Sequence, residues 1–221
     1  LVKGASQGEG LGNQFLGHIR GVDAIAHIVR CFEDPDVVHV HGSVNPKNDI
    51  EVINTELMLA DLDTVEKKLA RLEKAAKSGN KEALEEQGVA IALKEALNSG
   101  KPARTVKVEG GDKEKYFKAF QLLTAKPVLY VANVDEAGLS EDNQFVKQVK
   151  EIAAQEGAKV VVICGDVESE IAELPTDERA EYLKGMGLKE SGLDRMIKAG
   201  YELLGLSTYF TAGVKEVRAW T

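Results

Sequence analysis

Two short, continuous apolar runs separated by one amphipathic helix most constrain the fold of this chain. The runs are residues 128–132 (VLYVA) and 159–164 (KVVVIC), and residues 142–156 between them carry apolar side chains at helical spacing. Continuous apolar runs of this length indicate strands that are buried on both faces, and strand, helix and strand in succession are typical of parallel sheets. The sequence therefore predicts a parallel α/β sheet.

The rest of the chain extends this pattern. Residues 23–31 (DAIAHIVRC) are rich in Ile and Val and predict a further buried strand, and helical patterns follow the apolar runs at 167–174, 176–185 and 189–204. Helices between buried parallel strands predict a doubly wound, mostly parallel sheet.

A long helical segment interrupts this alternation. Apolar residues recur three and four positions apart from about 49 to 79 and again from 81 to 98, and Ser78-Gly79-Asn80 forms a stop signal between them. Two long amphipathic helices around a short break predict an antiparallel helical hairpin, followed by a linker at 99–112 and a helix at 113–124.

Charge and cysteine usage narrow the class of protein. The 28 Lys and Arg residues against 36 Asp and Glu residues give a net charge of −8, so no global positive field attracts nucleic acid, although a local basic patch could. Cys31 and Cys164 lie in apolar runs, which favours buried, reduced thiols in a cytoplasmic protein. No apolar stretch reaches the roughly 20 residues of a membrane helix, and we expect no membrane partner.

The residues that follow the predicted strands are the candidates for a binding site. In open α/β sheets, ligands bind beyond the carboxyl ends of the strands. Asn133-Val134-Asp135-Glu136 follows one apolar run, and Cys164-Gly165-Asp166 ends the next. One helix and one strand separate the two turns, so we expect them to lie side by side and to hold one planar ligand. No set of His, Cys, Asp and Glu has zinc-site spacing, and neither cysteine has an evident His base.

Several separated motifs resemble one protein family. A strand followed by Asn-x-x-acid, and one βα unit later by a turn of small residues, is similar to the base-recognition pair of the P-loop GTPases. The opening LVKGASQGEGLGNQFLGHIR resembles the segment after Asp-x-Ala-Gly in their Obg branch. DAIAHIVRCFEDPDVVHVHG, DIEVINTELMLADLDTVEKKL and YFTAGVKEVRAW resemble the YchF, or Obg-like ATPase, subfamily.

The resemblance implies a G-domain fold and assigns roles in base recognition. GTPases have Asp where this chain has Glu136, and a side chain longer by one methylene implies ATP as the preferred nucleotide over GTP. Asn133 would tie the two turns together and bond the base edge, and Val134 would pack on the face of the base. Backbone N–H groups of residues 164–166 would bond the base, although Asp166 replaces a common Ala.

The resemblance also implies a nucleotide switch. Switch II would include Leu1, Gly4, Gly8, Gly10 and Gly12, with Leu1 in the place of the glutamine that orients water in Ras-like enzymes. Because leucine cannot polarise water, hydrolysis is expected to be slow unless another group helps.

Histidines after the first predicted strand are the candidates for that help. The resemblance favours His39 over His41 as the catalytic group, and a solvent-facing loop histidine is the alternative.

The phosphate-binding motif G-x-x-x-x-G-K-[ST] does not occur in these residues. We therefore expect the Mg²⁺ that accompanies the nucleotide to have its ligands upstream, with no metal ligand within this chain. The first residue is not Met. The sequence is accordingly interpreted as a piece of a longer protein that binds nucleotide poorly and hydrolyses none by itself.

The expected domain organisation follows the family. Residues 1–50 and 113–208 would form two parts of the G-domain, 51–112 a coiled-coil insertion, and 209–221 the start of a TGS region. The arm and the TGS domain would flank a cleft for the ribosome or RNA. Lysines and an arginine form a basic run on the arm, but glutamates interleave with it, so a solvated face is the alternative; the basic residues are Lys67, Lys68, Arg71, Lys74 and Lys77.

Three functions therefore remain open. The first is a nucleotide hydrolase that acts as a translation-associated switch with ATP, or with GTP as the second choice. The second is a module without enzymatic activity that binds the ribosome or RNA through the hairpin. A GTP-binding protein with a nucleic-acid cleft is the third possibility.

Overall fold

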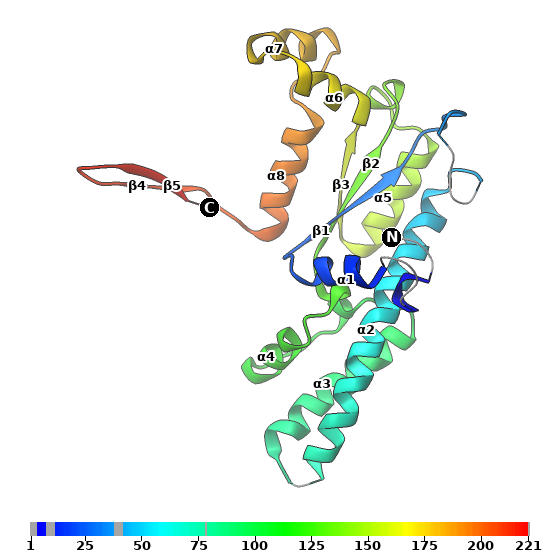
Figure 1. Ribbon diagram of the computed structural model, residues 1–221, viewed down its shortest axis with the longest axis vertical. Coiled ribbons are helices and arrows are strands. Elements are labelled where there is room, and N and C mark those ends of the chain that lie inside the picture. Colours follow the sequence, from blue (N-terminus) through cyan, green and yellow to red (C-terminus); the bar gives the residue numbers. More distant parts are fainter. Residues whose placement is uncertain (1–3, 8–11, 38–41, 78, 221) are drawn as a thin grey trace. The chain divides into compact units, whose positions relative to one another are not determined.

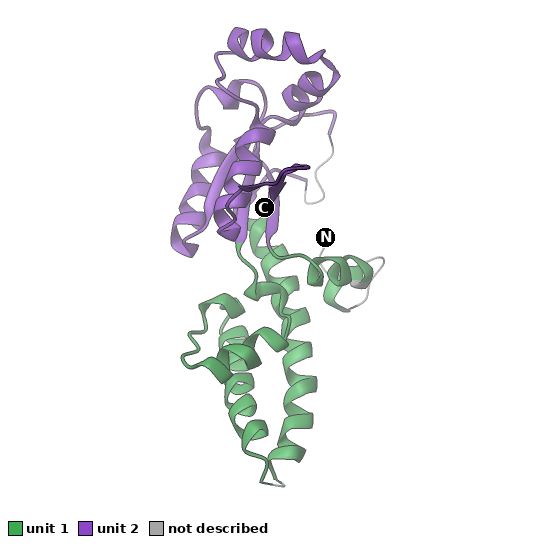
Figure 2. Cartoon of the chain, turned by 90° about the vertical axis from the view of Figure 1, so that its left-hand side faces the viewer, with its two compact units in different colours: residues 1–23, 48–127 green, residues 24–47, 128–221 purple. Residues whose placement is uncertain are grey.

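The computed structural model describes residues 4–7, 12–37, 42–77 and 79–220. By its internal contacts the chain forms two compact units (Figure 2). Unit 1 comprises residues 1–23 and 48–127, and unit 2 comprises residues 24–47 and 128–221. Each unit has its own packing and is described separately.

Unit 2 contains the parallel sheet. Its strands are β1 (Ile25–Arg30), β2 (Val128–Asn133) and β3 (Lys159–Ile163), in the order β1-β2-β3, so β2 is central (Figure 1). Both pairs are parallel, and Asn133 of β2 lies opposite Arg30 of β1 and Ile163 of β3. The carboxyl ends of the three strands are therefore level. All three predicted strands are confirmed.

Helices cover both faces of this sheet. Leu129 and Val131 pack with Ala199 of α8 (Gly192–Leu204). Tyr130 points to the opposite face, because side chains alternate along a strand, and its hydroxyl donates a hydrogen bond to Glu156, the last residue of α5 (Gln144–Glu156). Since α5 also connects β2 to β3, the doubly wound α/β arrangement is confirmed.

Local sequence signals set the ends of α5. The side chain of Asn143 accepts a hydrogen bond from the Val146 N–H at 2.9 Å, which caps the first turn. Gly157 ends the helix in the left-handed conformation at φ 66°, which glycine adopts without steric cost.

The remaining elements of unit 2 follow β3. They are α6 (Gly165–Glu173), α7 (Thr176–Gly185), α8, and an antiparallel pair of exposed strands, β4 (Tyr209–Ala212) and β5 (Val217–Trp220). The assignment of 209–221 to a TGS region stays a prediction, as do the other predicted domain boundaries.

Unit 1 contains the helical hairpin. It is formed by α2 (Pro46–Ala76) and α3 (Lys81–Asn98), which begins at the N-cap Asn80. The core contains Val65 and Leu72 of α2 together with Leu93 and Leu97 of α3. Apolar stripes at spacings of three and four predicted this pairing, and the two helices are present.

Segments after the hairpin complete its core. The short helix η2 (Ala103–Thr105) and α4 (Gly111–Ala119) pack against it through Ala103, Phe120 and Leu122. The prediction of a helix over 113–124 was wrong at its end, because α4 stops at Ala119 and Gln121 has a φ of 48°.

A buried carboxylate explains that early stop. Asp61 of α2, with no exposed surface, accepts hydrogen bonds at 2.7 Å from the N–H groups of Leu123 and Thr124 and from the Thr124 hydroxyl. The short helix η3 (Leu123–Ala125) is thereby fixed to α2 in place of a continued α4. Burial raises the pKa of Asp61, and these hydrogen bonds oppose the shift.

Unit 1 also contains the glycine-rich opening segment. Its elements are η1 (Ala5–Gln7) and α1 (Gly12–Arg20). Among the described residues of the chain, no helix is both long and apolar enough to cross a bilayer.

Candidate functional site

The candidate site is the carboxyl edge of the sheet in unit 2. Arg30, Asn133 and Ile163 end their strands at the same level. The residues that follow, which include Phe32 and Gly165, therefore meet at one edge, as the sequence predicted for neighbouring βα turns.

Asn133 connects two of these turns. Its side-chain Oδ1 accepts a hydrogen bond from the Gly165 N–H at 3.0 Å, across 32 residues of sequence. Gly165 is the first residue of α6, so the amide group joins the central strand to the beginning of that helix. The tie between the turns predicted for Asn133 is present, whereas its contact with a base stays a prediction.

Val134 differs from its predicted role. Its N–H donates to the Ile163 carbonyl at 2.8 Å, and its side chain is 2% exposed. A Cβ on Gly138 would lie 2.7 Å from the Val134 Cβ, which shows how closely the turn folds over this side chain. The prediction that Val134 packs on the face of a base is therefore not supported, because its side chain is enclosed by the turn.

The two acidic residues of the first turn have different surroundings. Asp135 Oδ1 accepts the Gly138 N–H at 2.9 Å and so stabilises the turn. Glu136 precedes the short helix η4 (Ala137–Leu139) and makes no side-chain cap to it. Both carboxylates are exposed, and Glu136 is the one whose side chain does not bond the η4 backbone.

The second turn presents a helix N-terminus. Cys164 is 2% exposed and precedes α6, and both Gly165 and Asp166 are exposed in its first turn. The first N–H groups of a helix have no partner within the helix, and they favour acceptor atoms and negative charge. The thiol of Cys164 is free and buried, so this turn can offer backbone groups rather than the thiol.

Arg30 organises the loop after β1, which the sequence analysis missed. Its guanidinium donates to the carbonyl groups of Phe32, Asp34 and Val37 at 3.1, 3.3 and 2.9 Å. It also lies 4.7 Å from the centre of the Phe32 ring. A half-buried aromatic ring is thereby held at the carboxyl edge, and an aromatic residue two positions after a strand was the available signal.

The end of β1 is also joined to its neighbours. The Cys31 N–H donates to the Asn133 carbonyl at 2.7 Å, and Asn143 Nδ2 donates to the Cys31 carbonyl at 2.7 Å. Cys31 is itself fully buried and forms no disulfide. Backbone bonds therefore fix this turn relative to β2 and α5.

Tyr182 of α7 belongs to the same surroundings. Its hydroxyl donates to the Glu170 carboxylate, and this bond is the main cause that raises its pKa to about 12. The charges of Glu136 and Cys164 add to the shift, which indicates that α7 lies near both turns. The phenol is neutral at physiological pH.

The predicted switch and catalytic residues fall partly within the structure. Gly4 and Gly12 are described, and Gly4 adopts a φ of 89° that favours glycine. Leu1, Gly8, Gly10 and His39 lie outside the described residues, so their predicted roles stay predictions. In the part of the chain that is described, no group of three or more His, Cys, Asp and Glu residues could hold a metal ion.

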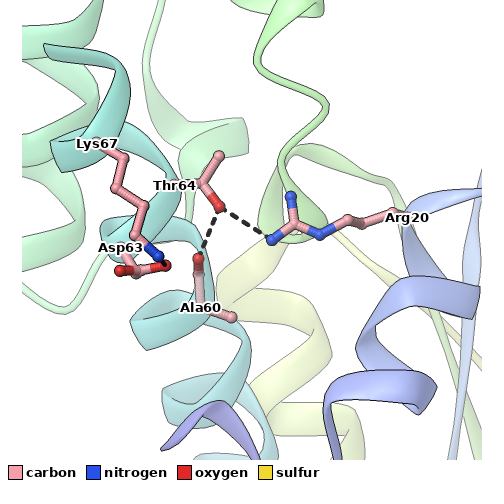
Figure 3. Close-up of polar contacts among 5 residues, drawn as sticks. All are labelled: Arg20, Ala60, Asp63, Thr64 and Lys67. Carbon is pink, nitrogen blue, oxygen red and sulfur yellow. Dashed lines mark hydrogen bonds and ion pairs between the residues drawn. The ribbon is translucent and has the colours of Figure 1, made fainter. Parts of the chain in front are cut away.

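A groove of about 590 Å³ lies on the hairpin in unit 1. Its polar lining includes Asp63, Thr64, Lys67 and Arg71, and the Lys67 ammonium pairs with Asp63 at 2.7 Å (Figure 3). Its other lining residues are Lys68, Leu72, Ala75, Ala119 and Phe120.

Lys68 has a mainly structural place in this groove. Its ammonium bonds Glu86 of α3 at 2.5 Å and lies 4.0 Å from the centre of the Phe120 ring. Lys67 and Arg71 are both exposed on α2. The groove is therefore basic at its surface and apolar at its base.

Comparison with known proteins gives consistent results over the whole chain. No family model matches. The chain is 54% identical to the ribosome-binding ATPase YchF of Bacillus subtilis and 53% identical to that of Escherichia coli O157:H7, over all of its own length. It spans 61% and 60% of these two relatives.

A solved structure shares the fold. The YchF GTPase of Schizosaccharomyces pombe matches 96% of the chain with a TM-score of 0.84 and 33% sequence identity, over 58% of the solved chain. The chain thus matches the YchF family of Obg-type P-loop proteins over its whole length in sequence and over 96% of its length in fold.

Proposed function

We propose that unit 2 supplies the base-recognition site of a nucleotide hydrolase that prefers ATP to GTP and acts in the cytoplasm as a ribosome-associated switch. The observation that carries this proposal is the hydrogen bond from Gly165 to Asn133, which holds two turns together at the carboxyl edge of a parallel sheet. The relatives are named as a ribosome-binding ATPase and a GTPase, and these names support the same class of activity.

Each residue of the edge has a distinct part in base binding. Asn133 holds the two turns at a fixed separation, and its Nδ2 group is directed to the base edge. The exposed carboxylate of Glu136 accepts a hydrogen bond from the exocyclic amine of the base. The N–H groups at the beginning of α6 bond acceptor atoms of the ring, and the half-buried ring of Phe32 supplies an apolar contact.

The length of Glu136 is the proposed cause of base selectivity. Guanine presents its N1–H and its amine as a pair of donors to one carboxylate, and that geometry suits the shorter Asp side chain. An additional methylene moves the carboxylate by roughly 1.5 Å along the side chain. The carboxylate is then placed for one donor group rather than for the guanine pair.

We assign phosphate and metal binding to residues outside this sheet edge. A nucleotide hydrolase of this class uses Mg²⁺ to neutralise phosphate charge, but the described residues form no cluster that fits the ion. We therefore assign its ligands elsewhere in the protein. Leu1 in the place of a water-orienting glutamine makes slow hydrolysis the expected behaviour, and His39 is the proposed catalytic group.

Titration of nucleotides against the protein at the length of its relatives tests the base site. We expect the protein, with Mg²⁺ present, to bind ATP more tightly than GTP, and Glu136→Asp to shift the preference toward GTP by about tenfold, the equivalent of one hydrogen bond. Glu141→Asp is the matched control, because Glu141 is an exposed carboxylate in the same loop. Binding of neither nucleotide to the unaltered protein overturns the proposal.

The hairpin groove favours a second function, which is attachment to the ribosome. The groove presents Lys67 and Arg71 above an apolar base, and the relatives are named as ribosome-binding proteins. Phosphate-rich surfaces are attracted to such a patch, and the attraction weakens as salt rises.

Cosedimentation with ribosomes tests this attachment. Charge reversal at both groove positions, Lys67→Glu with Arg71→Glu, is expected to lower binding by at least about tenfold. Lys74→Glu with Lys77→Glu is the matched control, because it makes the same change of charge outside the groove, in the last turn of α2 and at the residue that follows this helix. Equal losses from both double variants favour a solvated face without a defined site.

A further inference from the structure

Glu56 holds the glycine-rich segment against α2. Its Oε1 accepts the Gly4 N–H at 2.7 Å, and its Oε2 accepts the Ser6 N–H at 2.9 Å. The Glu56 residue is only 5% exposed, and it lies 52 residues from Gly4 and 50 residues from Ser6 in the sequence. The two oxygens of one buried carboxylate thus fix the beginning of η1.

A second contact fixes the other end of the same segment. The Arg20 Nη2 group, at the end of α1, donates to the Thr64 hydroxyl at 2.9 Å, and that hydroxyl donates to the Ala60 carbonyl at 3.0 Å (Figure 3). Thr64 lies eight residues after Glu56 on α2, a distance of about 12 Å along the helix axis. The segment is therefore attached to one helix at two points.

Gly12 packs directly against η1. Ala5 is fully buried, and a Cβ on Gly12 would lie 2.7 Å from the Ala5 Cα and 2.8 Å from the Ala5 carbonyl oxygen. Real Cβ contacts are not this short, so the start of α1 contacts η1 with no room for a side chain at residue 12.

We propose that Glu56 is the positioning residue that couples the nucleotide-sensing segment to the helical hairpin. This inference rests on the proposed function and on the expected switch II, which includes Gly4 and Gly12. If the segment moves away, the buried carboxylate loses the two charge-assisted hydrogen bonds from Gly4 and Ser6, and the loss of such bonds at a buried site is costly. Movement of the segment and movement of α2 are therefore linked.

The chemistry requires a glutamate at this position. A glutamine has one acceptor oxygen and would place its NH₂ group against one of the two N–H donors. An aspartate keeps the charge but is shorter by one methylene, so its oxygens cannot both reach Gly4 and Ser6 from the same place on α2. Glu56→Gln and Glu56→Asp thus disturb the contact in different ways.

Hydrogen exchange on the protein at the length of its relatives tests the inference. We expect Glu56→Gln to raise the exchange rates of the Gly4 and Ser6 amides by about tenfold, the value of one charge-assisted hydrogen bond. ATP should alter exchange in α2 of the unaltered protein and have no such effect in the variant. Glu73→Gln is the control, because Glu73 is an exposed carboxylate on the same helix and lies outside the groove.

Enzyme kinetics supply an independent readout. We expect Glu56→Gln to lower kcat by at least about fivefold with less than a twofold change in ATP affinity, because the residue positions the switch and does not contact the base. If Glu56→Gln does not fold, Glu56→Asp provides the same comparison with the charge retained.

The outcomes separate this inference from the proposed function. ATP-dependent exchange in α2 that is the same in the unaltered protein and in both variants overturns the coupling while the base site stands. Failure of the unaltered protein to bind ATP overturns the proposed function and, with it, the coupling.

Discussion

The Gly165 N–H donates a hydrogen bond to Asn133 Oδ1 at 3.0 Å, and this bond joins the end of the central strand to the first residue of α6. The backbone on either side is held as well, because the Val134 N–H donates to the Ile163 carbonyl at 2.8 Å. The two turns therefore keep one separation, which a flat ligand between them requires.

The first prediction separates the two roles of Asn133. Asn133→Leu removes the acceptor for Gly165, and we expect it to lower the free energy of unfolding by about 1 kcal/mol and to weaken ATP binding. Asn133→Asp keeps the acceptor oxygen but removes the NH₂ donor, so ATP binding should weaken while the free energy of unfolding changes by less than about 0.5 kcal/mol. Urea denaturation and ATP titration measure the two effects. Equal stability of both variants would contradict this assignment.

Local patterns in the sequence predicted the architecture of the site. The continuous apolar runs predicted β2 and β3, and the order of strands and helices predicted that their carboxyl ends meet. Asn133 was predictable for the same reason, because it is the last residue of β2 and its partner begins the helix that follows β3. Information of this kind lies within a few residues of each element.

Contacts between distant segments could not be predicted in this way. Asp61 accepts a hydrogen bond from Leu123, which lies 62 residues later in the sequence, just after α4 ends. Glu56 binds the opening segment across about 50 residues of sequence. Each is an acidic residue within an amphipathic helix, where a solvated position is the usual interpretation. Val134 was assigned to the ligand because its turn was recognised, but the fold of the turn over Gly138 buries it.

The second prediction concerns Asp61 and the integrity of unit 1. Three donors converge on its carboxylate, and the amide of Asp61→Asn would place an NH₂ group against one of them. We expect the free energy of unfolding to fall by about 1 to 3 kcal/mol, the cost of an unsatisfied buried polar group. Urea denaturation followed by circular dichroism measures the loss, and Asp63→Asn on the exposed side of α2 should be nearly neutral.

A third prediction gives the pH dependence of the same residue. Burial raises the pKa of Asp61 above its ordinary value of 3.8, so folding favours the protonated acid. Its contribution to stability is complete below that value and is lost as the pH rises through the raised pKa of the folded state. The stability advantage of the unaltered protein over Asp61→Asn should thus decrease over the pH range above 3.8. An advantage that grows over this range would show that the pKa is lowered instead.

The fourth prediction tests the role of Arg30 at the sheet edge. The planar guanidinium bonds three carbonyl groups and lies over the Phe32 ring, and a lysine ammonium cannot reproduce that set. Arg30→Lys should lower the free energy of unfolding by about 1 to 2 kcal/mol and weaken ATP binding. Arg218→Lys is the control, since Arg218 makes an exposed ion pair and should contribute less than about 1 kcal/mol.

The last prediction compares two glycines of α1 that have opposite surroundings. A Cβ at Gly12 would lie 2.7 to 2.8 Å from atoms of Ala5, whereas a Cβ at Gly17 would have no neighbouring atom within 4 Å. Gly12→Ala must displace η1, so we expect a loss of about 1 to 3 kcal/mol in unfolding free energy. The N–H groups that Glu56 binds should then exchange faster.

Gly17→Ala should stabilise α1 by up to about 1 kcal/mol, because alanine is the better helix former. Urea denaturation with hydrogen exchange measures both, and a Gly12→Ala protein as stable as Gly17→Ala would mean that η1 can shift without releasing Glu56.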